Sequence, residues 1–72
     1  MHPKIELLDT VALRDDLPGL GLLAGEVGAV VEVLGDDAFE VEFVDQTGRT
    51  YGQHALRREQ LMRLHQKGEA LR

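Results

Sequence analysis

Apolar and charged residues alternate strictly over residues 39–43, at the centre of segment 38–44 of the chain. The apolar positions are Phe39, Val41 and Phe43, and the charged positions between them are Glu40 and Glu42. A repeat of two residues indicates a β-strand with one buried face, because a helix would scatter these side chains around its axis. The segment is therefore predicted to be a strand whose core face carries both phenylalanines.

The segment before it, Val27–Leu34, is rich in β-branched residues and ends at the turn-forming cluster Gly35-Asp36-Asp37. Two such runs joined by a short turn are typical of an antiparallel hairpin. We expect Val31 and Val33 to share the buried face with the apolar residues of segment 38–44. The hairpin is the most clearly predicted element of the chain.

Three further strands are predicted around this hairpin. Asp9–Arg14 reads as a first strand, and Arg49–His54 follows the turn Asp45–Gly48 as a shorter, bent one. Residues 57–60 are expected to form one helical turn, and Leu61–Leu64 a short last strand. A continuous helix over residues 55–67 is the competing assignment, because this stretch also has helical propensity.

Segment Asp15–Gly25 joins the first strand to the hairpin. It holds a proline and three glycines, so regular structure is not expected across it. It also holds four leucines, at positions 17, 20, 22 and 23. A long apolar loop must either cover the core or meet a partner.

Five short strands at close spacing predict an all-β domain closed into a small barrel. Closure removes the unpaired edges that an open sheet would expose. We expect a single domain over residues 1–65, followed by a polar, frayed C-terminal tail over residues 66–72.

The composition excludes several classes of protein. The 72 residues include no cysteine, which rules out disulfides and thiolate zinc sites and fits a reducing compartment. No apolar run is long enough for a signal-peptide core or a membrane helix. We therefore expect a cytoplasmic protein that does not enter a membrane.

The charges are unevenly distributed along the chain. Residues 1–46 carry 11 acids and two bases, a net charge of −9, whereas residues 47–72 carry two acids and six bases, a net charge of +4. A phosphate backbone would be repelled by the larger part, and a basic protein would be attracted to it. Nucleic acid is thus an unlikely partner on charge grounds, and the arginines are expected to pair with neighbouring carboxylates.

The sequence resembles two groups of proteins. The run 25–33, a glycine followed by a β-branched strand, is similar to the corresponding part of SH3-like and KOW-type barrels, and the E subunit of photosystem I has a similar plan. This resemblance implies an all-β, five-stranded SH3-like barrel with one short helical turn before the last strand.

The second resemblance covers residues 7–64. They are similar to a family of short bacterial proteins classed only as a domain of unknown function, over matching stretches spread along this range: 8–13, 16–18, 25–28, 30–34, 39–45, 48–51 and 59–62. It implies a small stand-alone protein, and members of such families often lie beside nuclease-like or toxin-like partners. It transfers no catalytic residue.

The chain offers little catalytic or metal-binding chemistry. It has no serine or cysteine to act as a nucleophile, and its threonines occur in no recognisable nucleophile setting. The three histidines, His2, His54 and His65, match no ligand spacing. We therefore predict no enzymatic activity, no catalytic residue, no metal site and no cofactor.

The remaining hypothesis is a protein–protein interaction module, with an antitoxin or immunity-like member of a toxin pair as its sharpest form. An acidic surface can occupy the basic site of a nuclease and speed association with it. The predicted partner-binding residues are the acids of the hairpin and the leucines of the first loop: Glu32, Asp36, Asp37, Glu40, Glu42, Leu20, Leu22 and Leu23. The alternatives are an accessory subunit of a redox or ribosomal assembly and a self-associating structural protein. The oligomeric state stays open.

Overall fold

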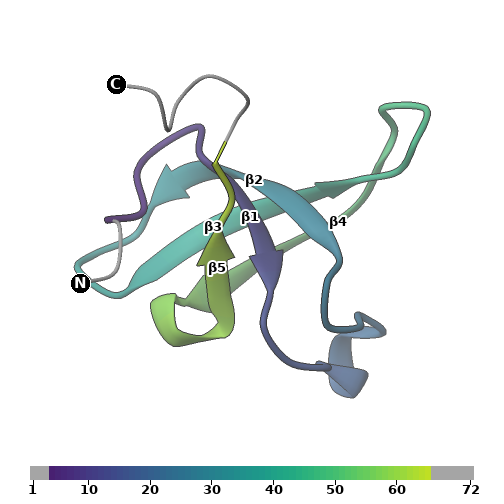
Figure 1. Cartoon of the computed structure of the whole chain (residues 1–72), viewed down its shortest axis with the longest axis horizontal. Helices are drawn as coiled ribbons and strands as arrows, with labels where there is room; N and C mark the ends of the chain where they lie inside the picture. The colour runs from purple at the N-terminus through teal and green to yellow at the C-terminus, as the bar shows by residue number, and fades with distance from the viewer. Residues whose placement is uncertain (1–3, 66–72) are drawn as a thin grey trace.

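A computed structural model describes residues 4–65 of the chain (Figure 1). Its strands are β1 (Thr10–Leu13), β2 (Val27–Val33), β3 (Ala38–Val44), β4 (Thr50–Arg57) and β5 (Leu61–Arg63). Two single 3-10 turns, η1 (Pro18–Leu20) and η2 (Arg58–Gln60), complete the fold. The strands form one antiparallel sheet in the order β4-β3-β2-β1-β5. The predicted all-β fold with a helical turn before the last strand is confirmed, and the alternative helix over residues 55–67 is wrong.

The predicted polar tail, residues 66–72, lies outside the described residues. The predicted bounds of β3 agree with the structure at both ends. Strand β1 is one residue shorter than predicted at each end, and β5 is one residue shorter at its C-terminal end. Strand β4 continues three residues further than predicted, to Arg57. Its pairing with β3 reaches Ala38, opposite Arg57, and this tertiary pairing overrides the local helical propensity of residues 55–57.

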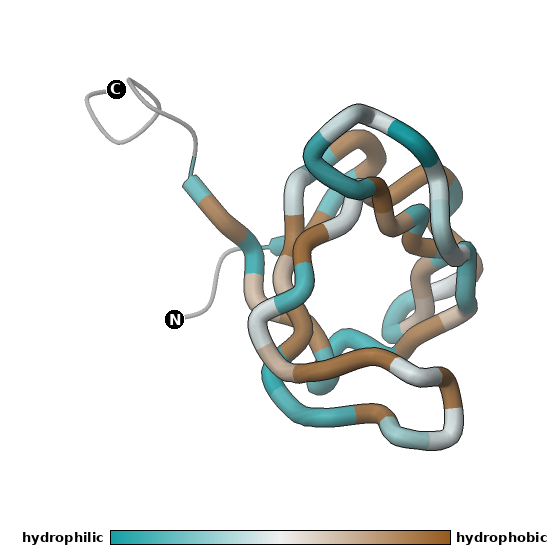
Figure 2. Tube along the Cα trace, turned by 90° about the vertical axis from the view of Figure 1, so that its right-hand side faces the viewer, coloured by the Kyte–Doolittle hydropathy of each residue, from teal (hydrophilic) through white to brown (hydrophobic). Residues whose placement is uncertain are grey.

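The sheet curls around a core made by the inward-facing residues of all five strands (Figure 2). Val11, Val30, Val41 and Phe43 are completely buried there. Ile5, from the segment before β1, and Leu22, from the first loop, pack into the same core. The alternation predicted for β3 is confirmed, because Phe39, Val41 and Phe43 are buried and the glutamates between them are not.

Strand β2 differs from the prediction at its centre. Val30 pairs with Val41 but Glu32 pairs with Glu40, so Val31 is an extra residue in a β-bulge. Val30 therefore takes the buried position, and Val31 stays 37% exposed. Val33 lies opposite Phe39, at the last residue of the strand, and is 48% exposed. The prediction that both valines are buried is wrong, for two different reasons. The bulge takes Val31 out of the side-chain alternation, whereas Val33 keeps the register of Phe39 but is left exposed at the end of the strand.

Gly28 explains how β2 can lie so close to β3. It is buried, and a Cβ atom at this position would lie 2.7 Å from the carbonyl oxygen of Glu42 and 2.8 Å from Cγ1 of Val41. Only glycine leaves room for this approach, so β2 packs its backbone rather than a side chain against the centre of β3.

The first loop is more ordered than its composition suggests. Leu17 and Leu22 form an isolated bridge across η1, and Gly21 ends that turn with a left-handed φ of 72°. The bridge turns Leu22 inward, where it is 3% exposed. The prediction that Leu22 belongs to a partner-binding surface is therefore corrected: its side chain completes the core.

Candidate functional site

The outer face of strands β2 and β3 carries three of the predicted partner-binding carboxylates. Glu32 lies directly opposite Glu40, and Glu42 follows two residues further along β3 on the same face. Glu32 is exposed, and the other two are half-buried. The fold thus brings together three like charges that lie up to ten residues apart in the sequence.

These carboxylates have only neutral partners in the part of the chain that the structure describes. Thr50 Oγ1 donates to Glu42 Oε2 at 2.9 Å, and Gln53 Nε2 donates to Glu40 Oε2 at 3.2 Å. No Lys, Arg or His side chain among residues 4–65 forms an ion pair with any of the three. Like charges directly opposite each other in a sheet are destabilising, so this arrangement lowers the stability of the isolated domain.

An apolar row crosses the same face next to the carboxylates. Ala12 of β1 pairs with Val27 of β2 on one side and with Met62 of β5 on the other. Ala12 is only 4% exposed, because its larger neighbours cover it, whereas Val27 and Met62 are 42% and 46% exposed. Val44, which follows the inward Phe43, extends the row onto β3 and is also exposed. Charge and apolar area therefore adjoin on one continuous sheet surface.

The two aspartates of the β2–β3 turn are exposed, as predicted for turn residues. Asp37 is tied to η2: its carbonyl oxygen accepts from the Arg58 amide at 2.8 Å, and its carboxylate lies 3.6 Å from Arg58 Nε. Arg58 therefore partly neutralises Asp37, which sets this residue apart from the unpaired glutamates of the sheet face.

The exposed leucines of the first loop, Leu20 and Leu23, lie far from that turn. The loop precedes β2 and the turn follows it, so the two regions are at opposite ends of the strand (Figure 1). The leucine-rich loop and the two aspartates of the turn therefore do not form one surface. The exposed apolar area next to the glutamates comes instead from the apolar row, which was not predicted from the sequence.

A further feature missed in the sequence joins the first loop to β4. The Glu26 carboxylate accepts the Tyr51 hydroxyl at 2.6 Å and the Leu23 amide at 2.6 Å. These two donors lower the pKa of Glu26, the Tyr51 bond having the larger effect. The same bond raises the pKa of Tyr51 to about 12. No local signal could have identified a pair separated by 25 residues.

The turn between β3 and β4 is organised by a single carboxylate. Asp45 Oδ1 accepts from the Thr47 hydroxyl at 2.7 Å and from the amides of Thr47 and Arg49, and these hydrogen bonds lower the pKa of Asp45. Gly48 completes the turn with a φ of 85° and donates its amide to the Asp45 carbonyl. Asp45 thus has a structural role in this turn.

Within residues 4–65, no three His, Cys, Asp or Glu side chains gather closely enough to hold a metal ion. In the same range, no helix has the length and apolar character required to cross a bilayer.

Comparison with known proteins gives one match. The sequence model of the family described as "Domain of unknown function (DUF4926)" matches residues 7–63. No curated protein and no solved structure matches the chain. The matched range includes all five strands and every residue of the outer face discussed above. The chain therefore belongs to the DUF4926 family, whose function is unknown.

Proposed function

We propose that this domain is a non-enzymatic protein-binding module that uses the outer face of its sheet to bind a basic protein. The observation that carries the proposal is the group of three carboxylates on β2 and β3 that no cation neutralises within the described chain. The register sets this group apart, because it places Glu32 directly opposite Glu40, whereas Asp9 and Asp37 each lie beside an arginine.

The charge arrangement favours a partner that supplies lysine or arginine. Unpaired like charges repel each other across the sheet, and a cation placed between Glu32 and Glu40 would relieve that repulsion. An acidic face also steers a basic partner toward it and speeds association, an effect that falls with rising salt. Binding would therefore remove an electrostatic cost that the free domain carries.

The apolar row beside the glutamates supplies the rest of the interface. Val27, Val44 and Met62 expose apolar area around the covered Ala12. Such area contributes roughly 25 cal/mol for each Å² that a partner removes from water. The expected partner surface thus has basic residues next to an apolar strip.

Two more specific roles extend this proposal: an antitoxin or immunity-like role, and a role as an accessory subunit. An antitoxin or immunity-like role requires a toxin partner whose substrate site is basic, such as a nuclease, because the acidic face could then occupy that site. A role as accessory subunit of a larger assembly requires a partner in a stable complex. The unpaired carboxylates favour the first role, since they match a site that normally binds a phosphate backbone.

Affinity capture with the full chain tests the proposal. The test variant carries Glu32→Gln, Glu40→Gln and Glu42→Gln, and the control carries Glu6→Gln, Asp15→Asn and Glu59→Gln, which remove the same charge from exposed positions elsewhere. We expect wild type and control to retain a basic partner from the native host, and the test variant to lose it.

The salt dependence of capture gives a second measurement. Retention of the partner by wild type should weaken as ionic strength rises. Equal capture by the test variant and the control would contradict the proposal. Co-expression with the product of the neighbouring open reading frame identifies the partner class: growth inhibition relieved by this domain supports the antitoxin role, and a stable complex without toxicity supports the accessory one.

A further inference from the structure

The sheet has two edge strands that differ in how fully the domain satisfies their backbone groups. Strands β4 and β5 stand at the two ends of the order β4-β3-β2-β1-β5, and each pairs with a single neighbour. The N–H and C=O groups on the other side of each strand therefore meet no further strand among residues 4–65. Unpaired groups of this kind are a template for the backbone of another chain.

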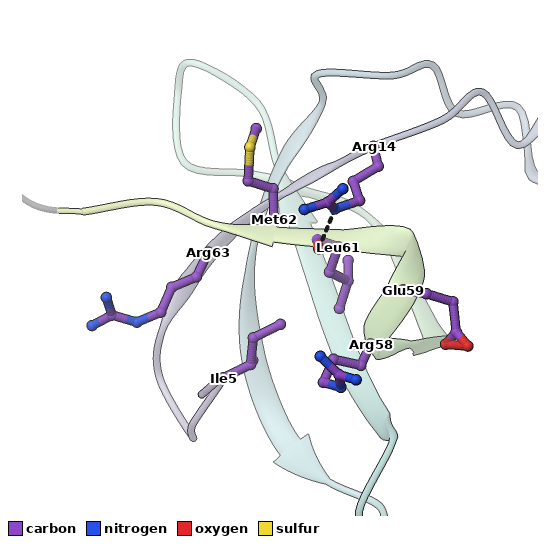
Figure 3. Close-up of a pocket in the computed structure, with 7 residues that line it drawn as sticks. All are labelled: Ile5, Arg14, Arg58, Glu59, Leu61, Met62 and Arg63. Atoms are coloured by element: carbon purple, nitrogen blue, oxygen red, sulfur yellow. Dashed lines mark hydrogen bonds between the residues drawn. The ribbon is translucent and has the colours of Figure 1, made fainter. Parts of the chain in front are cut away.

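The edge of β5 is capped by the domain itself. The Arg14 amide donates to the Gln60 carbonyl at 2.9 Å. In an antiparallel ladder, this bond makes Leu13 and Leu61 a pair that exchanges no hydrogen bonds, so the backbone groups of Leu61 point away from β1. Both groups have partners: the Leu61 amide donates to the Arg58 carbonyl, and Arg14 Nε donates to the Leu61 carbonyl at 3.1 Å (Figure 3). Figure 3 also shows the Arg14 and Arg58 side chains on the two sides of β5, so this edge is basic as well as capped.

The edge of β4 is capped only at its C-terminal end. The Arg58 amide donates to the Asp37 carbonyl at 2.8 Å, so Ala38 and Arg57 form a pair that exchanges no hydrogen bonds. The backbone groups of Arg57 therefore point away from β3. The Arg57 amide agrees with this direction, because it donates to Gln60 Oε1 at 2.8 Å. Gln60 thus closes the last position of the edge.

The next two positions of the β4 edge are open. Hydrogen-bonded and non-hydrogen-bonded pairs alternate along an antiparallel ladder, so the backbone groups of Ala55 and Gln53 also point away from β3. Both residues are exposed, and their amides and carbonyls have no partner in the part of the chain that the structure describes. Strand β4 also contains no proline or lysine, which commonly protect an edge from pairing.

This open edge adjoins the unneutralised carboxylates of the outer face. The register places Glu40 opposite Ala55 and Glu42 opposite Gln53. A residue added opposite Ala55 would lie two strand spacings from Glu40, about 10 Å, on the same face of the sheet. Only the methyl group of Ala55 lies between them. A lysine or arginine at the added position would therefore reach Glu40 and supply the cation that the domain lacks.

We infer that the basic partner adds an extended antiparallel segment to the open edge of β4, with lysine or arginine at every second position on the outward face. This inference rests on the proposed function and names how the partner binds. The intervening side chains of the segment would lie beside His54, which is half-buried on the inner side of β4, so we expect them to be apolar. A second copy of β4 fits less well, because its one lysine or arginine, Arg57, cannot place charge at every second position.

Titration of the full chain with a model peptide tests the inference. The probe is acetyl-Lys-Val-Lys-Val-Lys-Val-Lys-amide, followed by amide NMR and hydrogen exchange. We expect saturable binding at a Kd of about millimolar, with shifts along β4. At a peptide concentration of about ten times the Kd, the amides of Gln53 and Ala55 should exchange about tenfold more slowly, because the added strand supplies their missing acceptors.

Two N-methylated peptides separate strand addition from charge attraction. In the inferred pairing, the lysine amides of the peptide face β4 and the valine amides face away. N-methylation of the lysines should therefore weaken binding at least about tenfold, whereas N-methylation of the valines should change the Kd less than about twofold. The two peptides carry the same charge. A peptide with glutamate in place of each lysine should not bind.

Matched variants assign the effect to named positions. Glu40→Gln should raise the Kd about threefold, as expected for loss of a surface ion pair, and Glu6→Gln, which removes an exposed charge before β1, should not change it. Ala55→Pro removes an edge amide without removing a bond to β3, and it should raise the Kd at least about tenfold. Thermal melts establish that each variant is folded, and the methylated peptides give the same test on the wild-type chain.

The remaining outcomes would overturn the inference. Equal binding of the two methylated peptides would mean charge attraction without strand addition, and would leave the proposed acidic interface standing. Slow exchange of the Gln53 and Ala55 amides in the free chain, increasing with protein concentration, would assign the edge to a second copy. Absence of binding at tens of millimolar, or unchanged exchange at both amides on binding, would exclude the edge as the site. Loss of capture of the host partner by the triple glutamine variant tests the proposed function separately.

Discussion

The two faces of strand β3 contain residues that alternate in sequence, yet the fold uses them in opposite ways. On the inner face, Phe39, Val41 and Phe43 are buried against all the other strands. On the outer face, Glu40 and Glu42 share the surface with Glu32 and have no cationic partner among the described residues. The inner face is complete within the domain, whereas the outer face carries charges that the domain does not neutralise.

This difference separates the residues that stabilise the fold from the surface on which the proposed function rests. Burial of apolar area is the dominant favourable term in folding, and in a chain this short it must come from a few side chains. Unpaired surface carboxylates contribute little or oppose stability. The inner face therefore explains why the domain folds, and the outer face is where a partner would gain most. The following predictions test that division, beginning with the largest effect.

The largest effect is expected inside β3. Phe43→Ala should lower the free energy of unfolding by about 3–5 kcal/mol or prevent folding, because Phe43 is completely buried and its removal leaves a cavity. Val44→Ala, at the adjacent outward position, should cost less than about 1 kcal/mol because Val44 is exposed. Chemical denaturation of both variants measures the contrast, and equal losses would show that the two faces do not differ in this way.

The close approach of β2 to the inner face gives the next largest effect. Gly28→Ala should lower stability by about 1–3 kcal/mol, because the added Cβ would contact the Glu42 carbonyl and Val41 at less than van der Waals distance. Gly19→Ala is the control: its Cβ would have no neighbour within 4 Å, so stability should change by about 0.5 kcal/mol or less. A melting temperature unchanged by Gly28→Ala would mean that the strands can separate at no cost.

Glu26 is a carboxylate with a short hydrogen bond inside the domain, since it accepts the Tyr51 hydroxyl at 2.6 Å. The pKa of Tyr51 is raised from 10.0 to about 12. Its contribution to the free energy of unfolding is therefore complete below about pH 10 and is lost as pH rises through about 12. Glu26 has a lowered pKa, so its contribution is present above about pH 4.5 and is lost as pH falls through the lower folded value.

Tyr51→Phe removes that bond. The difference in melting temperature between wild type and Tyr51→Phe should be largest between about pH 5 and pH 10 and should shrink toward both extremes. The phenolate absorbance reports Tyr51 alone, because the chain has a single tyrosine. A phenol that titrates at its ordinary pKa in the folded protein would refute the assigned bond.

The smallest effect is expected on the outer face. Glu40→Gln and Glu32→Gln should each change the free energy of unfolding by no more than about 0.5 kcal/mol, with a slight gain since each removes a repulsive pair. Thermal melts at low and high salt measure this, and the gain should be smaller at high salt. A large loss from Glu40→Gln would mean that the outer carboxylates support the fold.

Much of the fold follows from local sequence patterns. The alternation of segment 38–44, the turn at Asp45–Gly48 and the helical turn before β5 are each determined by side chains that act within a few residues. A period of two residues specifies a half-buried strand, and a turn needs only residues that favour its backbone angles. The acidic character of the outer hairpin face was predictable for the same reason.

Other features were decided only by the tertiary structure. The bulge at Val31, the burial of Leu22 and the extension of β4 to Arg57 each depend on which strand lies opposite. The apolar row through Ala12, the Glu26–Tyr51 bond and the Arg63–Asp9 ion pair join segments far apart in the chain. A sequence determines which residues prefer a surface or a core, because that preference is a property of each side chain. Which of them meet is decided by strand register and chain closure, which depend on the whole fold.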